Sequence, residues 1–137
     1  MAVNTRTEYA LRALLEIHAS EAGSISAHMI CKLQSLPKKY VEHLLSSLKN
    51  AGLISSSAGS KGGYILARPA EKISLYDIME AVDDHAMELN CGMDKQYCLG
   101  TKCVLKPVFR DLAEKQRKLF RTYTLDKIGK IPAKEKK

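Results

Sequence analysis

The sequence predicts a mainly helical protein with one small β-hairpin and a long helix towards the C-terminus. Its 137 residues are about the length of one domain, and a hydrophobic content of 45% is enough to bury a core of ordinary size. The chain has two Phe and no Trp, and it is rich in Leu, Ala and Lys, which favour helices. Apolar residues recur at helical spacing in most segments, and only one segment has the pattern of a hairpin.

Three helices are expected before the hairpin. The first covers 5–19, where apolar residues form a broad stripe. The second is short, covers 27–34 and has Ser26 as a suitable N-cap. The third carries Pro37 in its first turn and stops at Gly52. The sequence SLP breaks the chain between the second and third helices, as in a helix-turn-helix.

The hairpin is expected at 53–67, LISSSAGSKGGYILA, where two short apolar runs flank a tip of Gly, Ser and Lys. Gly59, Gly62 and Gly63 permit the positive φ angles that a hairpin or a bulged turn requires. A hairpin that follows two helices with a short break forms the wing of a winged helix-turn-helix. The predicted fold class is therefore mainly α with a small β-hairpin wing, a winged helix-turn-helix plus a long C-terminal dimerisation helix.

Two more helices are expected after the hairpin. Ser74, with Asp77 three residues later, is a variant of the capping box and starts a helix with the sequence LYDIMEAVDD. The last helix runs from about Lys106 to Tyr123, and its apolar residues recur at spacings of three, four and seven. A long amphipathic helix outside the core needs a partner to cover its apolar stripe, so we expect a homodimer.

These elements divide the chain into four parts. A winged helix-turn-helix DNA-binding domain is expected over 1–85, and a cysteine-rich loop over 86–104. A dimerisation helix is expected over 105–128, followed by a flexible basic tail over 129–137. The tail contains no residues that a core would bury.

Positive charge is unevenly distributed along the chain, whose formal net charge is +7. Residues 32–61 hold five Lys against one Glu, residues 71–90 hold six acids against one Lys, and residues 91–137 hold thirteen bases against five acids. Segregated positive charge suits double-stranded DNA, because each neutralised phosphate releases condensed counterions. The alternative interpretation is a solvated, lysine-rich surface.

The second helix of a helix-turn-helix enters the major groove with its N-terminal residues nearest the bases. Lysine there suits phosphates or guanine, glutamate accepts from the cytosine amine, and histidine donates to a base or a phosphate. A lysine at the hairpin tip is placed to touch the backbone or the minor groove. The DNA-contacting residues expected on these grounds are Lys38, Lys39, Glu42, His43 and Lys61.

The N-terminal segment is neither the apolar region of a signal peptide nor a membrane span, because it contains Arg6, Glu8, Arg12 and Glu16. We expect a cytoplasmic protein with no membrane contact. In that compartment clustered cysteines are more often metal ligands or reactive thiols than parts of a disulfide framework.

Three of the four cysteines, Cys91, Cys98 and Cys103, lie within thirteen residues. Their spacing of six and four intervening residues differs from the Cys-x-x-Cys knuckle of structural zinc sites. The wider gaps let a loop wrap an object larger than one ion, and an iron–sulfur cluster bound by thiolates is such an object. A mononuclear zinc or iron site, thiol redox sensing without a metal, and the absence of any role remain open.

The fourth cysteine, Cys31, lies three residues after His28 on the short second helix, and the two share a face. A small redox protein or a cysteine enzyme would need such a nucleophile with a positioned base and a pocket. Free cysteine is among the most buried residue types, so we interpret Cys31 as part of the core. We expect no enzymatic activity.

The segments TEYALRAL, PKKYVEHLLSSLKNAGLI, GSKGGYILARP and ISLYDIMEAVD, followed by three cysteines and a long helix, resemble a family of bacterial winged-helix regulators. This is the Rrf-two family, which includes IscR, NsrR and RirA, and the resemblance runs from about Asn4 to Tyr123. It implies a transcriptional regulator that binds a roughly palindromic operator as a homodimer. The positions that contact DNA in relatives are Lys39, Tyr40, Glu42 and His43 in this chain.

One departure from the family concerns the wing. Many relatives carry Arg ahead of the wing glycine, where this chain has Ala58. We therefore expect the minor-groove contact to be weaker than in those relatives or to rest on Lys61.

The resemblance also implies that the cysteine loop holds an iron–sulfur cluster, of the 2Fe–2S or 4Fe–4S type. Cys91, Cys98 and Cys103 match the three ligand positions of the family, with the middle cysteine shifted by one residue. IscR-like members add a histidine three residues after the third cysteine, where this chain has Lys106, a protonated donor and a poor ligand. NsrR-like members use an acidic residue of the other subunit, and Glu8 occupies that position.

Two alternatives remain open within the family. Glu8 is also interpretable as an ordinary first-turn acid favoured by the helix dipole. A cluster-binding member would sense iron, oxygen, redox state or nitric oxide. A metal-free member would respond instead to thiol state or to a metabolic partner.

Overall fold

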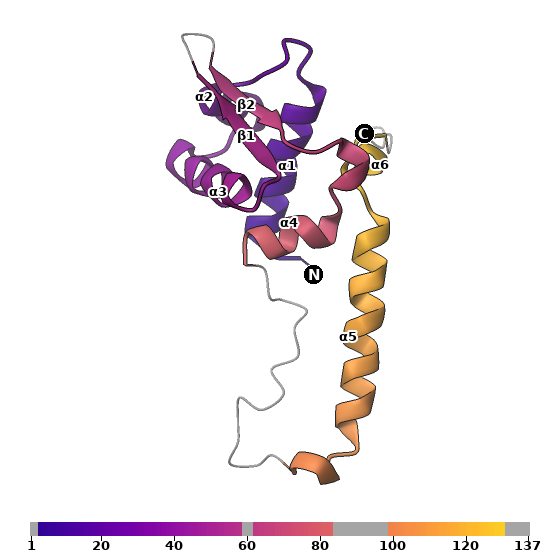
Figure 1. Ribbon diagram of the computed structural model, residues 1–137. Helices are drawn as coiled ribbons and strands as arrows, with labels where there is room; N and C mark the ends of the chain where they lie inside the picture. The colour runs from indigo at the N-terminus through magenta and orange to yellow at the C-terminus, as the bar shows by residue number, and fades with distance from the viewer. Residues whose placement is uncertain (1–2, 59–61, 84–98, 131–137) are drawn as a thin grey trace, which may run out of the picture.

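Helix α1 (Thr5–Ala19) lies at the centre of the molecule (Figure 1). The structure is a computed structural model that describes residues 3–58, 62–83 and 99–130. The elements that follow α1 in chain order are α2 (Ala27–Gln34), α3 (Lys38–Asn50), β1 (Ile54–Ser57), β2 (Gly63–Leu66), η1 (Ala70–Lys72), α4 (Leu75–Ala81), η2 (Gly100–Lys102), α5 (Leu105–Thr122) and α6 (Leu125–Lys130). This confirms the predicted fold class, a winged helix-turn-helix with a long C-terminal helix.

The core forms where the apolar stripes of α1 and α3 meet. Each stripe arises because apolar residues three or four positions apart share one face of a helix. Each fully buried leucine stabilises the fold by roughly 2 kcal/mol. The buried residues of the two helices are Ala10, Ala13, Leu14, Ile17, Val41, Leu44, Leu45 and Leu48.

Local capping interactions fix where the helices begin. Ser26 accepts a hydrogen bond of 3.1 Å from the Met29 backbone N–H and starts α2, as predicted. Ser74 accepts a 3.1 Å bond from the Asp77 N–H, while the Asp77 carboxylate accepts a 3.0 Å bond from the Ser74 N–H. This reciprocal pair is the predicted capping box of α4. Ser35 ends α2 in the left-handed region at φ 54° and turns the chain into α3.

The wing is a two-stranded antiparallel hairpin in which Ile54 pairs with Leu66 and Ser57 with Gly63. Ile25 adds a single bridge to β2, because its N–H donates to the Tyr64 carbonyl at 3.2 Å and the Tyr64 N–H donates to the Ile25 carbonyl at 2.8 Å. No pattern in the sequence indicates this bridge, since Ile25 is one apolar residue in a short loop.

The helix predicted from about Lys106 to Tyr123 is α5 (Leu105–Thr122), and the region assigned to it over 105–128 also contains the start of a second helix. Helix α5 ends at Thr122, and a separate helix, α6, packs back onto α1 and η1. The Leu75 N–H donates to the Tyr123 carbonyl at 2.7 Å, and the Leu125 N–H donates to the Ile73 carbonyl at 2.8 Å. Leu125 is fully buried in the main core. Burial of Leu125 thus draws the chain out of α5 and into the body of the molecule.

Two other predicted boundaries, the end of the fourth helix and the start of the basic tail, also differ from those in the structure. Helix α4 ends at Ala81, earlier than the sequence LYDIMEAVDD predicts. The predicted basic tail over 129–137 begins inside α6, and its remaining residues lie outside the described ranges.

Helix α5 projects away from the body (Figure 1). Only Phe120, near its C-terminal end, is buried, and the contacts of α5 with the body are made mainly with α4. None of the described helices combines the length and the apolar character needed to cross a bilayer.

Candidate nucleic-acid interface and sensor residues

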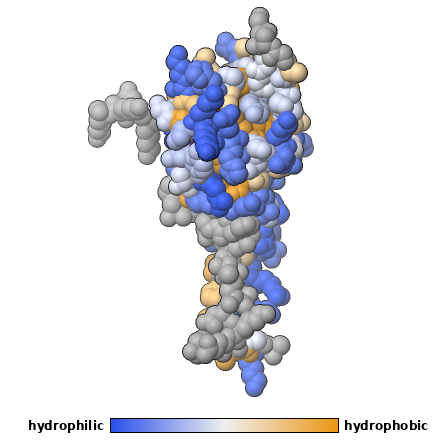
Figure 2. Space-filling model, turned by 90° about the vertical axis from the view of Figure 1, so that its left-hand side faces the viewer, coloured by the Kyte–Doolittle hydropathy of each residue, from blue (hydrophilic) through white to orange (hydrophobic). Residues whose placement is uncertain are grey.

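Helix α3 presents its polar face to solvent because its apolar face is anchored in the core. Lys38, Lys39, Glu42 and His43 are all exposed on this helix, as the sequence predicts. The side of the molecule that carries α3 in Figure 1 is mostly hydrophilic, with small apolar spots (Figure 2). The arrangement leaves two cations, one carboxylate and one imidazole free to meet a charged surface.

Tyr40 differs from its neighbours on α3 because it is half-buried. Its ring packs edge-on against Tyr9 of α1, with the ring centroids 5.5 Å apart and the planes at 78°. Aromatic pairs favour this geometry. The Tyr40 ring therefore helps to set the position of α3 on α1, and any contact between Tyr40 and DNA stays a prediction.

The predicted wing contact is only partly described. Ala58, which directly follows β1, is exposed, and Lys61 lies outside the described residues.

Glu8 is exposed in the first turn of α1, where it forms an ion pair with Arg12 at 3.4 Å. The Arg12 guanidinium also donates to two atoms of Gln34, to the side-chain oxygen at 2.9 Å and to the backbone carbonyl at 2.6 Å. The Gln34 amide in turn donates to the Glu16 carboxylate. Arg12 thus joins Glu8 to the last residue of α2, immediately before the turn into α3.

The sequence analysis missed this role of Arg12. A glutamate four residues before an arginine is a recognisable helical pair, but the bonds to Gln34 cross between two helices. The guanidinium also lies 5.4 Å from the centre of the Tyr9 ring. Arg12 therefore contacts both the carboxylate of Glu8 and the aromatic pair that supports α3.

Cys103 is half-buried, has a free thiol and ends the short helix η2, two residues before α5 begins. Cys91 and Cys98 lie outside the described residues. Within the described ranges there is no group of three or more His, Cys, Asp or Glu side chains that would hold a metal ion. The donor types fit an iron–sulfur cluster, since soft thiolates are its usual ligands. Cys103 and Glu8 are the described members of the predicted ligand set.

A single subunit does not bring Cys103 and Glu8 together. Helix α1 begins beside α4, whereas η2 lies at the far end of α5 (Figure 1). Helix α5 has 18 residues and, at about 1.5 Å per residue, is about 27 Å long.

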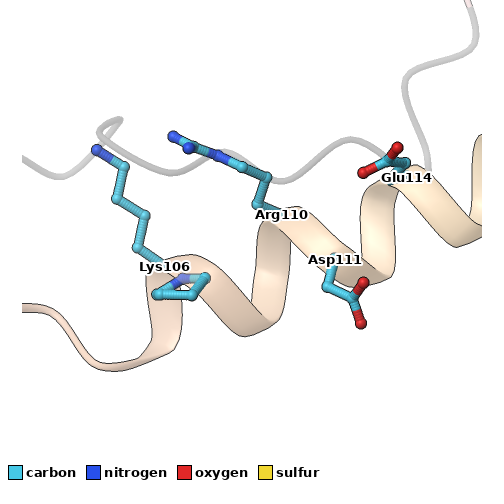
Figure 3. A pocket seen from close by; sticks show the side chains of 5 residues that line it. Lys106, Arg110, Asp111 and Glu114 are labelled. Carbon is cyan, nitrogen blue, oxygen red and sulfur yellow. The ribbon is translucent and has the colours of Figure 1, made fainter.

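Lys106 stands at the start of α5, where IscR-like members have a histidine. It lines a shallow surface hollow together with Pro107, Arg110, Asp111 and Glu114. Lys106 and Arg110 extend on the same side of the helix, and Asp111 points to the other side (Figure 3). Asp111 pairs with Lys115 at 2.8 Å, and this contact raises the pKa of the lysine. The hollow is open and formed by one helix, so it does not enclose a ligand.

Cys31 packs against the core, as the sequence predicts. Burial raises the pKa of its thiol, and the nearby carboxylate of Glu42 raises it further. His28 is exposed on the same helix. A protonated thiol is a poor nucleophile, so this pair does not form the activated centre that a cysteine enzyme requires.

An apolar stripe on the projecting part of α5 is exposed to solvent. Leu105, Val108, Leu112 and Leu119 have exposed fractions of 50%, 52%, 47% and 54%. Leu105, Leu112 and Leu119 are seven residues apart, which places them on one face of the helix.

Comparison with known proteins agrees with this architecture. The Rrf2 family, described as an iron-dependent transcriptional regulator, matches residues 3–130. The chain is similar to the HTH-type transcriptional regulator IscR of Escherichia coli, with 32% identity over 130 residues, which cover 93% of this chain and 80% of the relative.

Solved structures show the same fold. CymR, the global cysteine regulator of B. subtilis, aligns with a TM-score of 0.76 and 23% identity over 94% of this chain and 96% of its own. T. potens IscR aligns with a TM-score of 0.72 and 27% identity over 93% and 85% of the two chains. An oxidised form of Staphylococcus aureus CymR gives a TM-score of 0.73 and 27% identity over 98% and 100%.

The family match covers the described winged helix-turn-helix, η2, α5 and α6. The protein therefore belongs to the Rrf2 family of DNA-binding transcriptional regulators, which are not enzymes.

Proposed function

We propose that this regulator is a cytoplasmic homodimer whose affinity for a palindromic operator is controlled by an iron–sulfur cluster. Cys91, Cys98 and Cys103 would hold the cluster, and Glu8 of the second subunit would complete the ligand set. The observation that carries the proposal is that three cysteines lie within thirteen residues directly before α5. Cys103, the last of the three, lies in the described part of the chain and has a free thiol. A bound cluster would supply a site sensitive to iron, oxygen, redox state or nitric oxide.

DNA contact in this proposal centres on the N-terminal half of α3. Lys38 and Lys39 are suited to phosphates or guanine, and Glu42 and His43 to base edges. Lys61 would add a contact from the wing. Tyr40 would act mainly by holding α3 in position through its contact with Tyr9.

Dimerisation is supported by the exposed stripe of α5. Leucines that are about half exposed along one face of a projecting helix are poorly accounted for in a single subunit. A second copy presents the same stripe, and a twofold axis would let the two stripes cover each other. Two regulators joined in this way would carry two copies of α3, which matches a palindromic operator.

Ligation of the cluster by Glu8 of the other subunit follows from the same arrangement. Helix α1, which carries Glu8, begins in the body beside α4, whereas η2, which directly precedes Cys103, lies at the far end of α5 (Figure 1). Pairing through α5 would place the η2 end of one chain near the body of the other, provided that the two helices run antiparallel. Glu8 of one subunit would then be available to the cysteines of its partner.

Signal transfer would run through Arg12. Its guanidinium contacts Glu8 and donates to the backbone carbonyl of Gln34, which immediately precedes the turn into α3. A change in the state of Glu8 would alter the ion pair that it forms with Arg12, and so the position of that turn. A difference of about 1.4 kcal/mol between the two states changes operator affinity about tenfold.

A metal-free regulator that responds to thiol state or to a metabolic partner is the second candidate. One of the similar structures is an oxidised form of CymR. This candidate predicts that replacing Cys91, Cys98 and Cys103 by Ala leaves signal-dependent release of DNA intact.

Anaerobic purification separates the two candidates. The protein should be coloured, and its iron and sulfide should be present in the ratio of a cluster. Replacing Cys103 by Ala should remove both the visible absorbance and the iron. Glu8→Ala should lose the cluster faster in air than the wild type, whereas Glu21→Ala, an exposed acid in the loop after α1, should not. A colourless protein without iron, even after anaerobic reconstitution, would leave only the metal-free candidate.

A further inference from the structure

Lys49 connects the end of α3 to the wing. It lies in the last turn of the helix, and its Nζ donates to the hydroxyl oxygen of Ser56 on β1 at 2.9 Å. Both residues are exposed. The bond holds the lysine head at the surface between the two elements that a winged helix-turn-helix applies to DNA.

The charge of Lys49 is not neutralised in the described part of the chain. Ser56 is an uncharged partner, and no carboxylate of the described residues forms an ion pair with Lys49. An ammonium group has three N–H donors, so two remain after the bond to Ser56. Because the Ser56 oxygen accepts from Lys49, the hydroxyl hydrogen of Ser56 also remains to donate. The pair therefore offers several donors and one positive charge from two fixed elements.

The spacing along α3 fits the width of the DNA groove. Ten residues separate Lys39 from Lys49, which is about 15 Å along a helix. The major groove of B-DNA is about 12 Å wide. Lysines at the two ends of α3 are thus far enough apart to approach the phosphates on both sides of the groove.

We propose that Lys49 and Ser56 together bind a backbone phosphate of the DNA strand that passes between α3 and the wing. Lys49 would supply the charge, and Ser56 would both position Lys49 and donate a second hydrogen bond. The contact would strengthen binding to any sequence and would fix the angle of the wing on the duplex. It does not depend on the cluster.

Binding of the full-length protein to a fluorescently labelled duplex of random sequence, measured at several salt concentrations, tests the proposal. Each lost phosphate contact reduces the slope of log affinity against log salt by about 0.9. Lys49→Met should show this reduction for each bound subunit. The ratio of wild-type affinity to Lys49→Met affinity should therefore fall by about threefold per subunit when the salt concentration rises fourfold. Lys49→Arg should keep the slope of the wild type.

Two controls separate the contact from general charge. Lys72→Met removes an equal charge from η1 and should leave the slope unchanged. Ser56→Ala should weaken binding less than Lys49→Met and keep the slope, because the charge remains. The proposal is overturned if Lys49→Met and Lys72→Met have the same slope. Unchanged affinity of Ser56→Ala at every salt concentration would overturn the joint contact.

Discussion

Gly63 is the residue at which the wing approaches the loop before α2 most closely. A Cβ atom at this position would lie 2.6 Å from both the carbonyl carbon and the carbonyl oxygen of Ile25. These are backbone atoms, so they have little freedom to move away. Glycine is required here by close packing of two backbone segments, whereas the sequence analysis assigned it to turn formation.

Gly63→Ala should therefore destabilise the protein by about 2 kcal/mol, because the backbone must shift and the bridge between Ile25 and Tyr64 is lost. Thermal unfolding followed by circular dichroism should show a midpoint several degrees lower. Gly129→Ala is the matched control, since its Cβ would make ordinary contacts of 3.6 Å with His18 and Leu15. That variant should be neutral or slightly stabilising, because alanine favours a helix. Equal midpoints for the two variants would contradict the role of Gly63.

Arg12 and Tyr40 show how single residues take on roles set by other elements. Helical spacing alone would leave Arg12 facing solvent and would place Tyr40 on the apolar face of α3 with Leu44, but it does not indicate what either residue contacts. In the structure, Arg12 ties α1 to the end of α2 through Gln34, and Tyr40 packs on Tyr9. Their surroundings consist of residues distant in sequence, which periodicity cannot reveal.

At the scale of elements, α5 is the helix least supported by its own chain. Only Phe120 of its residues is buried, and its apolar stripe faces solvent over most of its length. Leu112, which is 47% exposed, lies in the middle of the stripe. The proposed dimer interface would bury it.

Leu112→Glu should convert the protein to a monomer, because a carboxylate buried without a partner costs several kcal/mol. A loss of 3 kcal/mol would raise the dimer dissociation constant by about two orders of magnitude. Light scattering coupled to size-exclusion chromatography would measure the mass. Glu114→Lys, two residues along and away from the stripe, is the control and should remain dimeric. A wild-type protein of monomer mass, or a dimeric Leu112→Glu variant, would exclude this interface.

The C-terminal elements show how tertiary contacts reinforce a helix end. Apolar spacing predicts that the long helix ends at about Tyr123, and α5 ends at Thr122. The Tyr123 carbonyl accepts a hydrogen bond from Leu75, and the Leu125 N–H donates to Ile73. These bonds and the full burial of Leu125 are favoured over continuation of the helix. These interactions are tertiary, so local propensity does not indicate them.

At the scale of the whole molecule, the proposed sensor is shared between subunits. Of its proposed ligands, Glu8 belongs to α1, which begins in the body, and Cys103 follows η2 at the far end of α5 (Figure 1). A site built in this way would exist only in the dimer, and it would link the cluster of one subunit to the α3 of the other through Arg12.

Mixed dimers test this sharing. One subunit carries Glu8→Ala, and the other carries Cys91→Ala, Cys98→Ala and Cys103→Ala. If Glu8 acts across the dimer, the cysteines of the first subunit meet the Glu8 of the second, and one complete site forms. Dimers purified through two different affinity tags should then hold about half of the wild-type iron and sulfide. A dimer of wild-type and cysteine-free subunits gives the reference value. An empty mixed dimer, with a half-loaded reference, would place Glu8 and the cysteines in the same subunit.

The sequence by itself determined the fold class and the starts of two helices, together with the exposed polar face of α3. Periodicity defines which face of a helix is buried, and Ser26 and Ser74 bond to backbone groups only three residues away, so these features are local. Only the tertiary structure decided that Gly63 must be small, that Tyr40 packs on Tyr9 of α1, and that Leu125 is buried in the main core. Each of these depends on atoms that are distant in sequence and come within contact range only when the chain has folded.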